Sequence, residues 1–170
     1  MSDAPAAVPA ELLIVDDDEK IRKLLRLWFL DEGYVVHEAA DADAGLALLS
    51  LKPIAVMTID KDMPGHDGVW LVEQVQKAHP GVAMLLASGD DQIPVRVAMS
   101  RGIQGYLVKP FTRKLVTTAT KAALAWHEVA KKNAAGGQAP PASPIDEWLQ
   151  NAAGRKPALV PEPEPDPKPE

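Results

Sequence analysis

The chain has 170 residues and a formal net charge of −6; 46% of the residues are hydrophobic and 25% are charged. Such a length allows one globular domain plus an appendage. The absence of cysteine excludes disulfides and thiolate sites. The acidic balance is unlike that of a nucleic-acid-binding domain, no apolar run approaches the roughly 18 residues of a membrane span, and no secretory signal opens the chain. We therefore expect a cytoplasmic protein that neither contacts nucleic acid directly nor inserts into a membrane.

Proline divides the chain into two parts. Nine of the 16 prolines lie at or after residue 140, and Pro161–Glu170 alternates proline with mainly acidic residues, which cannot bury a core. We therefore predict a disordered N-terminus at residues 1–10, one folded domain at 11–132 and a proline-rich acidic tail at 133–170. Within the tail, Ser143–Ala153 has a capping serine, an acidic first turn and an apolar face, which predicts a short helix at 143–153.

Five short apolar runs alternate with segments of helical spacing such as Glu19–Glu32 and Val69–His79. Buried strands that alternate with helices indicate βαβ units and a parallel sheet covered on both faces. The sequence thus predicts an α/β, doubly wound fold with a five-stranded parallel sheet. Its last helix begins near Thr112, runs toward Lys132 and is ended by Gly136-Gly137. The predicted strands are Leu12–Val15, Tyr34–Val36, Ile54–Ile59, Val82–Ala87 and Gly105–Val108.

Polar residues follow four of these strands, at the edge of the sheet where ligands bind in open α/β folds. They are Asp16 and Asp17 after the first strand, Asp60 after the third, Ser88 after the fourth and Lys109 after the fifth. Clustered carboxylates need a cation, and oxygen ligands suit Mg²⁺. A lysine and a serine hydroxyl would complete a phosphoryl site in which an aspartate is the acceptor. Each feature alone also has a structural explanation, as a helix N-cap or a turn, and only their joint placement favours the site.

The motifs LLIVDDDEKIR, IDKDMPGHDG, LLASGDD and GYLVKPF resemble, in this order and spacing, the receiver domain of two-component response regulators. The resemblance covers about 100 residues from Leu12 to Phe111 and is closest to single-domain, chemotaxis-regulator-like members. It implies a flavodoxin-like sheet with strand order 2-1-3-4-5, an order that the residues alone do not give.

The resemblance also implies a role for each matching residue. Asp60 is the phosphoacceptor and Lys109 contacts the phosphoryl group, while Ser88 and Tyr106 form the switch, with Tyr106 swinging inward on activation. Mg²⁺ is bound by Asp17 directly, by Asp16 mainly through water, by Asp60, and by the backbone carbonyl of Asp62. Pro110 follows a cis peptide bond after Lys109.

The implied function is a phosphorelay in which a histidine kinase or phosphotransfer protein donates a phosphoryl group to Asp60. The tail lacks the features of a DNA-binding output domain, so we expect signalling through contact with an unknown protein target. Such a protein is no enzyme beyond its own phosphorylation and dephosphorylation. The alternative is a Mg²⁺-dependent phosphatase of the haloacid-dehalogenase type, which shares the DxD motif of Asp60-Lys61-Asp62. Those enzymes carry the acidic pair last, whereas here it comes first.

Several residues depart from the usual family pattern. Lys61 and Asp62 stand where apolar or amide residues are common, and the Asp62 carboxylate is expected to alter metal affinity or the lifetime of the phosphoryl group. Leu24–Leu30 is apolar on more than one side, which favours either extra core packing or a docking surface for the phosphodonor. Trp70 is expected to be an incidental surface tryptophan. The four histidines share no metal-site spacing and are expected at the surface.

Overall fold

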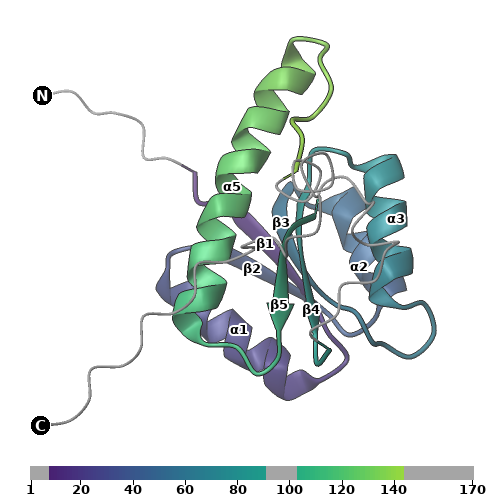
Figure 1. Ribbon diagram of the computed structural model, residues 1–170, viewed down its shortest axis with the longest axis vertical. Coiled ribbons are helices and arrows are strands. Elements are labelled where there is room, and N and C mark those ends of the chain that lie inside the picture. Colours follow the sequence, from purple (N-terminus) through teal and green to yellow (C-terminus); the bar gives the residue numbers. More distant parts are fainter. Residues whose placement is uncertain (1–7, 91–102, 144–170) are drawn as a thin grey trace, which may run out of the picture.

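The computed structural model describes residues 8–90 and 103–143, and within them five parallel strands form one sheet in the order β2-β1-β3-β4-β5. This confirms the predicted doubly wound α/β fold. Helices α1 and α5 cover one face of the sheet, and α2 and α3 cover the other (Figure 1). The strands are β1 (Glu11–Val15), β2 (Val35–Ala39), β3 (Ile54–Asp60), β4 (Ala83–Ser88) and β5 (Ile103–Val108). The helices are α1 (Glu19–Asp31), α2 (Ala42–Leu51), α3 (Gly68–Ala78) and α5 (Arg113–Ala135).

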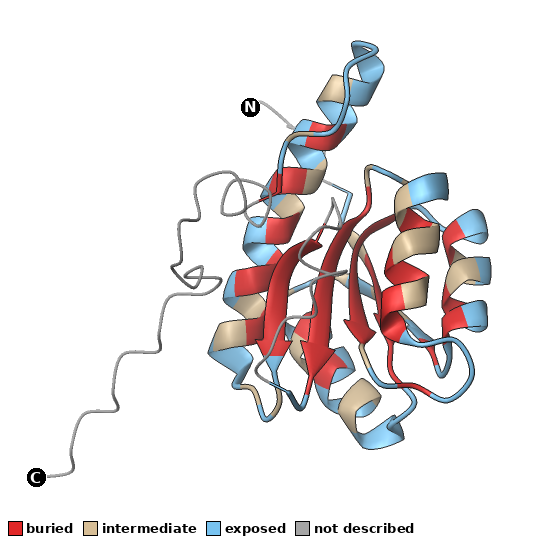
Figure 2. Ribbon diagram, turned by 45° about the vertical axis from the view of Figure 1, so that its right-hand side comes forward, coloured by how far each residue is buried: buried red, intermediate tan, exposed pale blue. Residues whose placement is uncertain are grey.

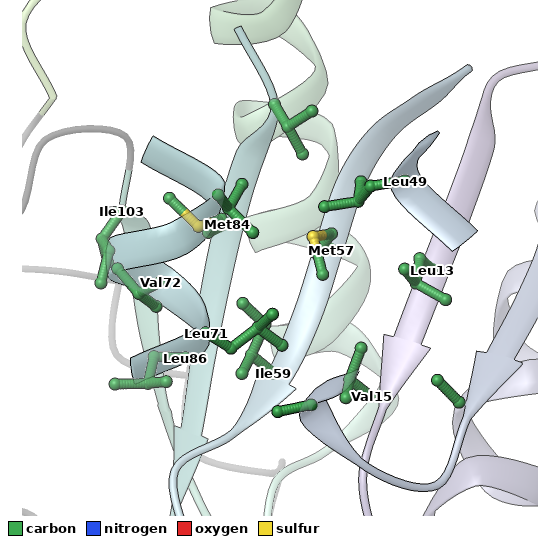
Figure 3. Packing of buried hydrophobic residues seen from close by; sticks show 14 of the residues in the cluster. Leu13, Val15, Leu49, Met57, Ile59, Leu71, Val72, Met84, Leu86 and Ile103 are labelled. Atoms are coloured by element: carbon green, nitrogen blue, oxygen red, sulfur yellow. The ribbon is translucent and has the colours of Figure 1, made fainter. Parts of the chain in front are cut away.

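The core consists of two apolar layers on opposite faces of the sheet. All residues of β3 and β4 are buried, as expected for central strands of a parallel sheet (Figure 2). Because side chains alternate along a strand, Met57 and Ile59 of β3 contact α2 and α3, whereas Val56 lies on the α1 and α5 side. Figure 3 shows the first layer, in which Leu71 of α3 packs among these β3 side chains and Met84 of β4.

Side-chain caps fix where the helices begin. Asp18, Asp41, Asp67 and Thr112 precede α1, α2, α3 and α5, and the side-chain oxygen of each accepts a backbone N–H of the first turn. The predicted cap at Thr112 is thus confirmed. Helix α5 runs to Ala135, three residues beyond Lys132, and ends at the predicted glycines.

The edge strands differ most from their predicted bounds. Strand β2 is Val35–Ala39 rather than Tyr34–Val36, because an edge strand is only partly buried and tolerates the polar residues His37 and Glu38. At the other edge, β5 begins at Ile103, two residues before the predicted start at Gly105. Its extra residues are buried, but Gln104 interrupts the apolar run that the prediction used.

The chain turns back along α5 after residue 135. Asn133 Nδ2 donates to the carbonyl of Ala139 at 3.0 Å, and Trp126 Nε1 donates to that of Pro141 at 3.2 Å. Ser143 is fully buried. Packed structure therefore continues beyond residue 132. The predicted helix between β4 and β5 lies outside the described residues, as do residues 144–153 of the predicted tail helix. No helix within residues 8–90 and 103–143 has the length and apolar character needed to cross a membrane.

Candidate functional site

The sheet register brings the predicted site residues to one edge. Val15 of β1 pairs with Ile59 of β3, so Asp16, which follows β1, and Asp60, the last residue of β3, lie side by side. On the other side of β3, Asp60 pairs with Ala87, which precedes Ser88. Lys109 is brought to the same edge because its backbone N–H donates to the carbonyl of Ser88 at 2.7 Å.

Three carboxylates form an acidic cluster at this edge of the sheet. Asp16, Asp17 and Asp60 each offer an oxygen, and these oxygens lie within 4.8 Å of one another. Asp16 and Asp60 are 2% and 6% exposed, whereas Asp17 is exposed. The Lys109 ammonium sits between the two buried acids, with Nζ 3.0 Å from Asp16 Oδ2 and 3.1 Å from Asp60 Oδ1. One cation therefore faces two buried anions.

Burial and the neighbouring charges shift two pKa values in this cluster. Burial, together with the negative charge of Asp16, raises the pKa of Asp60 from 3.8 to about 6, although Lys109 acts in the opposite direction. Burial by itself would lower the pKa of Lys109, but the carboxylates of Asp16 and Asp60 outweigh it and raise that pKa. Lys109 thus stays charged, and Asp60 is an anion that a further cation would stabilise.

In the loop between β1 and α1, one aspartate caps the helix and the two before it belong to the acidic cluster. Asp18 caps α1, with its Oδ1 2.8 Å from the N–H of Lys20, so Asp16 and Asp17 are not needed for that role. Asp16 Oδ1 instead accepts the N–H of Asp18 at 2.9 Å, and Arg22 Nη1 donates to the carbonyl of Asp16 at 2.7 Å. Sequence reasoning missed Arg22, whose motif position gives no hint that its side chain reaches back to this loop.

Gly68 was also missed, although it fixes the acceptor's backbone. Its N–H donates to the carbonyl of Lys61 at 2.9 Å, so the start of α3 lies against the end of β3. A Cβ at Gly68 would lie 2.8 Å from Lys61 Cα and still closer to the carbonyl oxygen of Asp60. Only glycine permits this approach without a backbone shift.

The predicted switch residues meet at the backbone of Asp90. Ser88 is fully buried, and its Oγ accepts the N–H of Asp90 at 3.0 Å. Tyr106 is 5% exposed and its hydroxyl donates to the carbonyl of Asp90 at 3.1 Å. The tyrosine ring is therefore already turned inward in this structure.

Asp62 lies apart from the acidic cluster. Its side chain is 72% exposed and its Oδ2 is 3.9 Å from Lys61 Nζ. The metal-binding role of its backbone carbonyl stays a prediction. The Lys109-Pro110 bond is cis, as the resemblance implied.

An apolar surface of α1 borders the site. Leu24, Leu27 and Leu30 are exposed, while Leu25 and Phe29 supply the core contacts, so extra core packing does not account for the whole apolar segment. An open cavity of about 290 Å³ lies beside it, lined by Ile21, Leu24, Lys109, Pro110 and Phe111.

The aromatic and histidine predictions are only partly right. Trp70 is partly buried against the core and stacks on His66, with ring centroids 3.7 Å apart. His66 is exposed, as expected. His37, His79 and His127 are partly buried, and His37 and His127 each have a hydrogen-bond partner, Glu11 Oε2 and the Gly81 carbonyl.

The acidic cluster fits a magnesium ion by its donor chemistry. All three candidate ligands are carboxylate oxygens, the donors that Mg²⁺ prefers, and none is a histidine nitrogen. Two are buried with a single ammonium to neutralise them, which leaves negative charge for a divalent cation.

Comparisons with known proteins agree with this geometry. Residues 12–121 match the response regulator receiver domain. The chain is 34% identical to the transcriptional regulatory protein GlrR of Escherichia coli K12 over 117 residues, which are 68% of this chain and 26% of GlrR. It is also 34% identical to the transcriptional regulatory protein ResD of Bacillus subtilis over 116 residues, 67% of this chain and 48% of ResD. The chain thus spans a quarter to a half of these curated relatives.

A solved structure gives the same result for the fold. The CheY-like response regulator receiver domain protein of Methanospirillum hungatei JF-1 superposes with a TM-score of 0.68 at 28% identity, covering 71% of this chain and 98% of that one. Receiver domains bind Mg²⁺ at an acidic pocket and are phosphorylated by histidine kinases. Match, fold and acidic edge together place the chain in one family: it belongs to the response regulator receiver domains.

Proposed function

We propose that this chain is the phosphoacceptor of a two-component phosphorelay and that Asp60 receives the phosphoryl group in a Mg²⁺-dependent reaction. The observation that carries the proposal is the arrangement of Asp60, a buried carboxylate with Lys109 Nζ at 3.1 Å and the Asp16 carboxylate beside it. A nucleophile, a fixed ammonium and a cation site are the parts that phosphoryl transfer to a carboxylate requires.

The reaction uses Asp60 as the nucleophile. One of its carboxylate oxygens attacks the phosphorus of a phosphohistidine, the P–N bond breaks, and the imidazole leaves with the electron pair and is then protonated. With a pKa of about 6, Asp60 is mainly ionised at pH 7 and is ready to attack. Lys109, which already faces Asp60, stabilises negative charge on the phosphoryl oxygens.

The metal would be held by Asp16, Asp17 and Asp60, with the backbone carbonyl of Asp62 as a further ligand. Bound Mg²⁺ supplies positive charge that offsets the repulsion between the carboxylates and the incoming phosphoryl group. Asp16 is held for this task from both sides, by the Asp18 N–H at its carboxylate and by Arg22 at its carbonyl.

The signal passes through Ser88 and Tyr106. The Ser88 oxygen accepts the Asp90 N–H, which leaves its own O–H available for donation to a phosphoryl oxygen. Any movement of the peptide at Asp90 reaches the Tyr106 hydroxyl and thereby β5. Output through protein contact with a target not yet identified is consistent with this route.

The phosphodonor, a histidine kinase or phosphotransfer protein, docks on the apolar surface of α1. Leu27 is 61% exposed and lies on the same helix as Leu24, which lines the cavity beside Lys109. We expect Leu27→Asp to slow transfer from the phosphodonor but not from acetyl phosphate. Leu51→Asp is the matched control, because Leu51 is 75% exposed on α2, on the other face of the sheet. Equal slowing with acetyl phosphate would contradict docking at α1.

The acceptor is tested with acetyl phosphate and Mg²⁺, followed by intact-mass measurement. The wild-type chain should gain one phosphoryl group, Asp60→Asn should gain none, and the addition of EDTA should stop the wild-type reaction. Asp31→Asn is the control, because it removes an exposed carboxylate that pairs with Arg113. If Asp60→Asn still gained a phosphoryl group, the proposal would be overturned.

The side chain of Asp62 is expected to affect the phosphorylated state of Asp60 less severely than the loss of Asp60 itself. We expect Asp62→Ala to change the lifetime of the aspartyl phosphate, because it removes a carboxylate in the loop that follows the acceptor. Decay of the purified phosphoprotein measures this, and equal decay of the two proteins would contradict it.

A further inference from the structure

Lys61 is an ammonium in an enclosed position beside the phosphoacceptor. Its side chain is only 14% exposed, and Nζ lies 3.7 Å from Asp90 Oδ2 and 3.9 Å from Asp62 Oδ2. A charge that is largely removed from water needs a partner of opposite charge. Lys61 therefore bridges the loop after β3, where Asp62 lies, and the loop after β4, where Asp90 lies.

Asp90 is the residue through which this bridge reaches the switch. Its N–H bonds Ser88 Oγ, its carbonyl bonds the Tyr106 hydroxyl, and its carboxylate pairs with Lys61. Three side chains from β4, β5 and the end of β3 thus converge on one residue. A displacement of Asp90 would change the contacts of both the serine and the tyrosine.

The sheet itself does not hold Asp90. The backbone ladder between β4 and β5 ends at the pair of Ser88 with Val108, and Asp90 lies two residues further along the chain. Lys61 is better anchored, because its N–H donates to the Ala87 carbonyl at 2.7 Å and its carbonyl accepts the Gly68 N–H. The ion pair therefore joins Lys61, which two backbone hydrogen bonds hold, to a residue that lies beyond the β4–β5 ladder.

Resting on the phosphoacceptor function proposed above, we infer that Lys61 is a positioning residue of this site. Its ammonium holds Asp90 through the carboxylate, and the Asp90 backbone in turn holds the Ser88 hydroxyl and the inward Tyr106 ring. The chain thus keeps its switch in the inward arrangement before any phosphoryl group is bound, and less rearrangement is needed when one arrives.

The tyrosines provide a direct measurement. The chain has two tyrosines, Tyr34 and Tyr106, so protein labelled with 3-fluorotyrosine gives two fluorine resonances, of which Tyr34 is an internal reference. Lys61→Met keeps most of the apolar stem and removes the charge. It should move the Tyr106 resonance toward that of an exposed tyrosine without any ligand. With Mg²⁺ present, it should also raise the beryllofluoride concentration for half-saturation by up to about fivefold, the range for a partly exposed ion pair.

Four further variants separate a positioning role of Lys61 from other roles. Asp90→Asn should move the Tyr106 resonance in the same direction as Lys61→Met, and the double variant should change it by less than the sum of the two single changes, because both substitutions remove the same ion pair. Lys61→Arg should restore the wild-type resonance. Lys23→Met removes one charge from an exposed pair with Glu19 on α1 and should behave as wild type.

The outcomes that overturn the inference are distinct. A Tyr106 resonance unchanged in Lys61→Met would refute positioning, even if beryllofluoride affinity falls, since Lys61 would then contact the phosphoryl group itself. Additive effects of Lys61→Met and Asp90→Asn would refute the route through Asp90. Failure of the wild-type protein to bind beryllofluoride would instead refute the phosphoacceptor function, while the ligand-free Tyr106 resonance still tests Lys61.

Discussion

The site has a charged half and a neutral half, and different contacts hold the groups of each half in place. The charged half consists of Asp16, Asp17, Asp60 and Lys109. The neutral half consists of Ser88, Tyr106 and the backbone of Asp90. Sheet register and direct ion pairs fix the charged half, where Lys109 contacts two buried carboxylates. In the neutral half, strands β4 and β5 hold the backbones of Ser88 and Tyr106, while their hydroxyl groups form hydrogen bonds of about 3 Å with Asp90, two residues beyond the end of β4. Such bonds are weak and easily exchanged. The first half is thus suited to bind charge and the second to respond to it.

Lys109→Met breaks the charged half most severely. It leaves two buried carboxylates without their cation, and loss of one partner of a buried pair costs about 3–5 kcal/mol. We expect a loss of unfolding free energy of that size at pH 7 in EDTA, measured by urea denaturation. Added Mg²⁺ should restore part of it, because a cation returns to the carboxylates. Equal stability of wild type and variant in EDTA would contradict the described ion pairs.

The titration of Asp60 gives the next largest effect. Its pKa is raised from 3.8 to about 6 in the folded chain, so between these values the folded state binds more protons than the unfolded state. The contribution of Asp60 to stability is therefore favourable at low pH and is lost as pH rises toward 6, by up to about 3 kcal/mol. The measurement is the stability difference between wild type and Asp60→Asn in EDTA from pH 4 to pH 7. A stability difference that stays constant across this pH range would show that the pKa of Asp60 is not raised in the folded chain.

The charged half was largely predictable from sequence, and the reason is geometric. Parallel strands end at one edge, so the residues after each apolar run, such as Asp16, Asp60 and Lys109, must come together. The contacts that support them were not predictable. Arg22 reaches backward from a helix, and the pair of Lys61 with Asp90 depends on how two loops fold. Likewise, the edge strand β2 was misplaced because half-buried strands lack a continuous apolar run.

Two glycine substitutions compare the halves directly. Gly68 lies against the Asp60 backbone without room for a Cβ, whereas Gly89, next to Ser88, has no atom of residues 8–90 or 103–143 within 4 Å of its Cβ position. We expect Gly68→Ala to cost about 1–3 kcal/mol of unfolding free energy and to slow phosphorylation by acetyl phosphate, because the acceptor's backbone must shift. Gly89→Ala should change neither quantity markedly. Similar urea midpoints for the two variants would mean that the start of α3 does not constrain Asp60.

Ser88→Ala is expected to have a small effect on stability and the sharpest effect on the response to a phosphoryl group. The substitution removes one neutral hydrogen bond to the Asp90 N–H, which is worth about 1 kcal/mol, and it leaves every charged group in place. Binding of Mg²⁺ should therefore persist. The fluorine resonance of Tyr106 should no longer respond to beryllofluoride, because the hydroxyl that links the phosphoryl oxygens to Asp90 is gone. If Tyr106 still responded as in wild type, the signal would have to leave the charged half through Lys109 and β5, and the neutral half would be a support and not a switch.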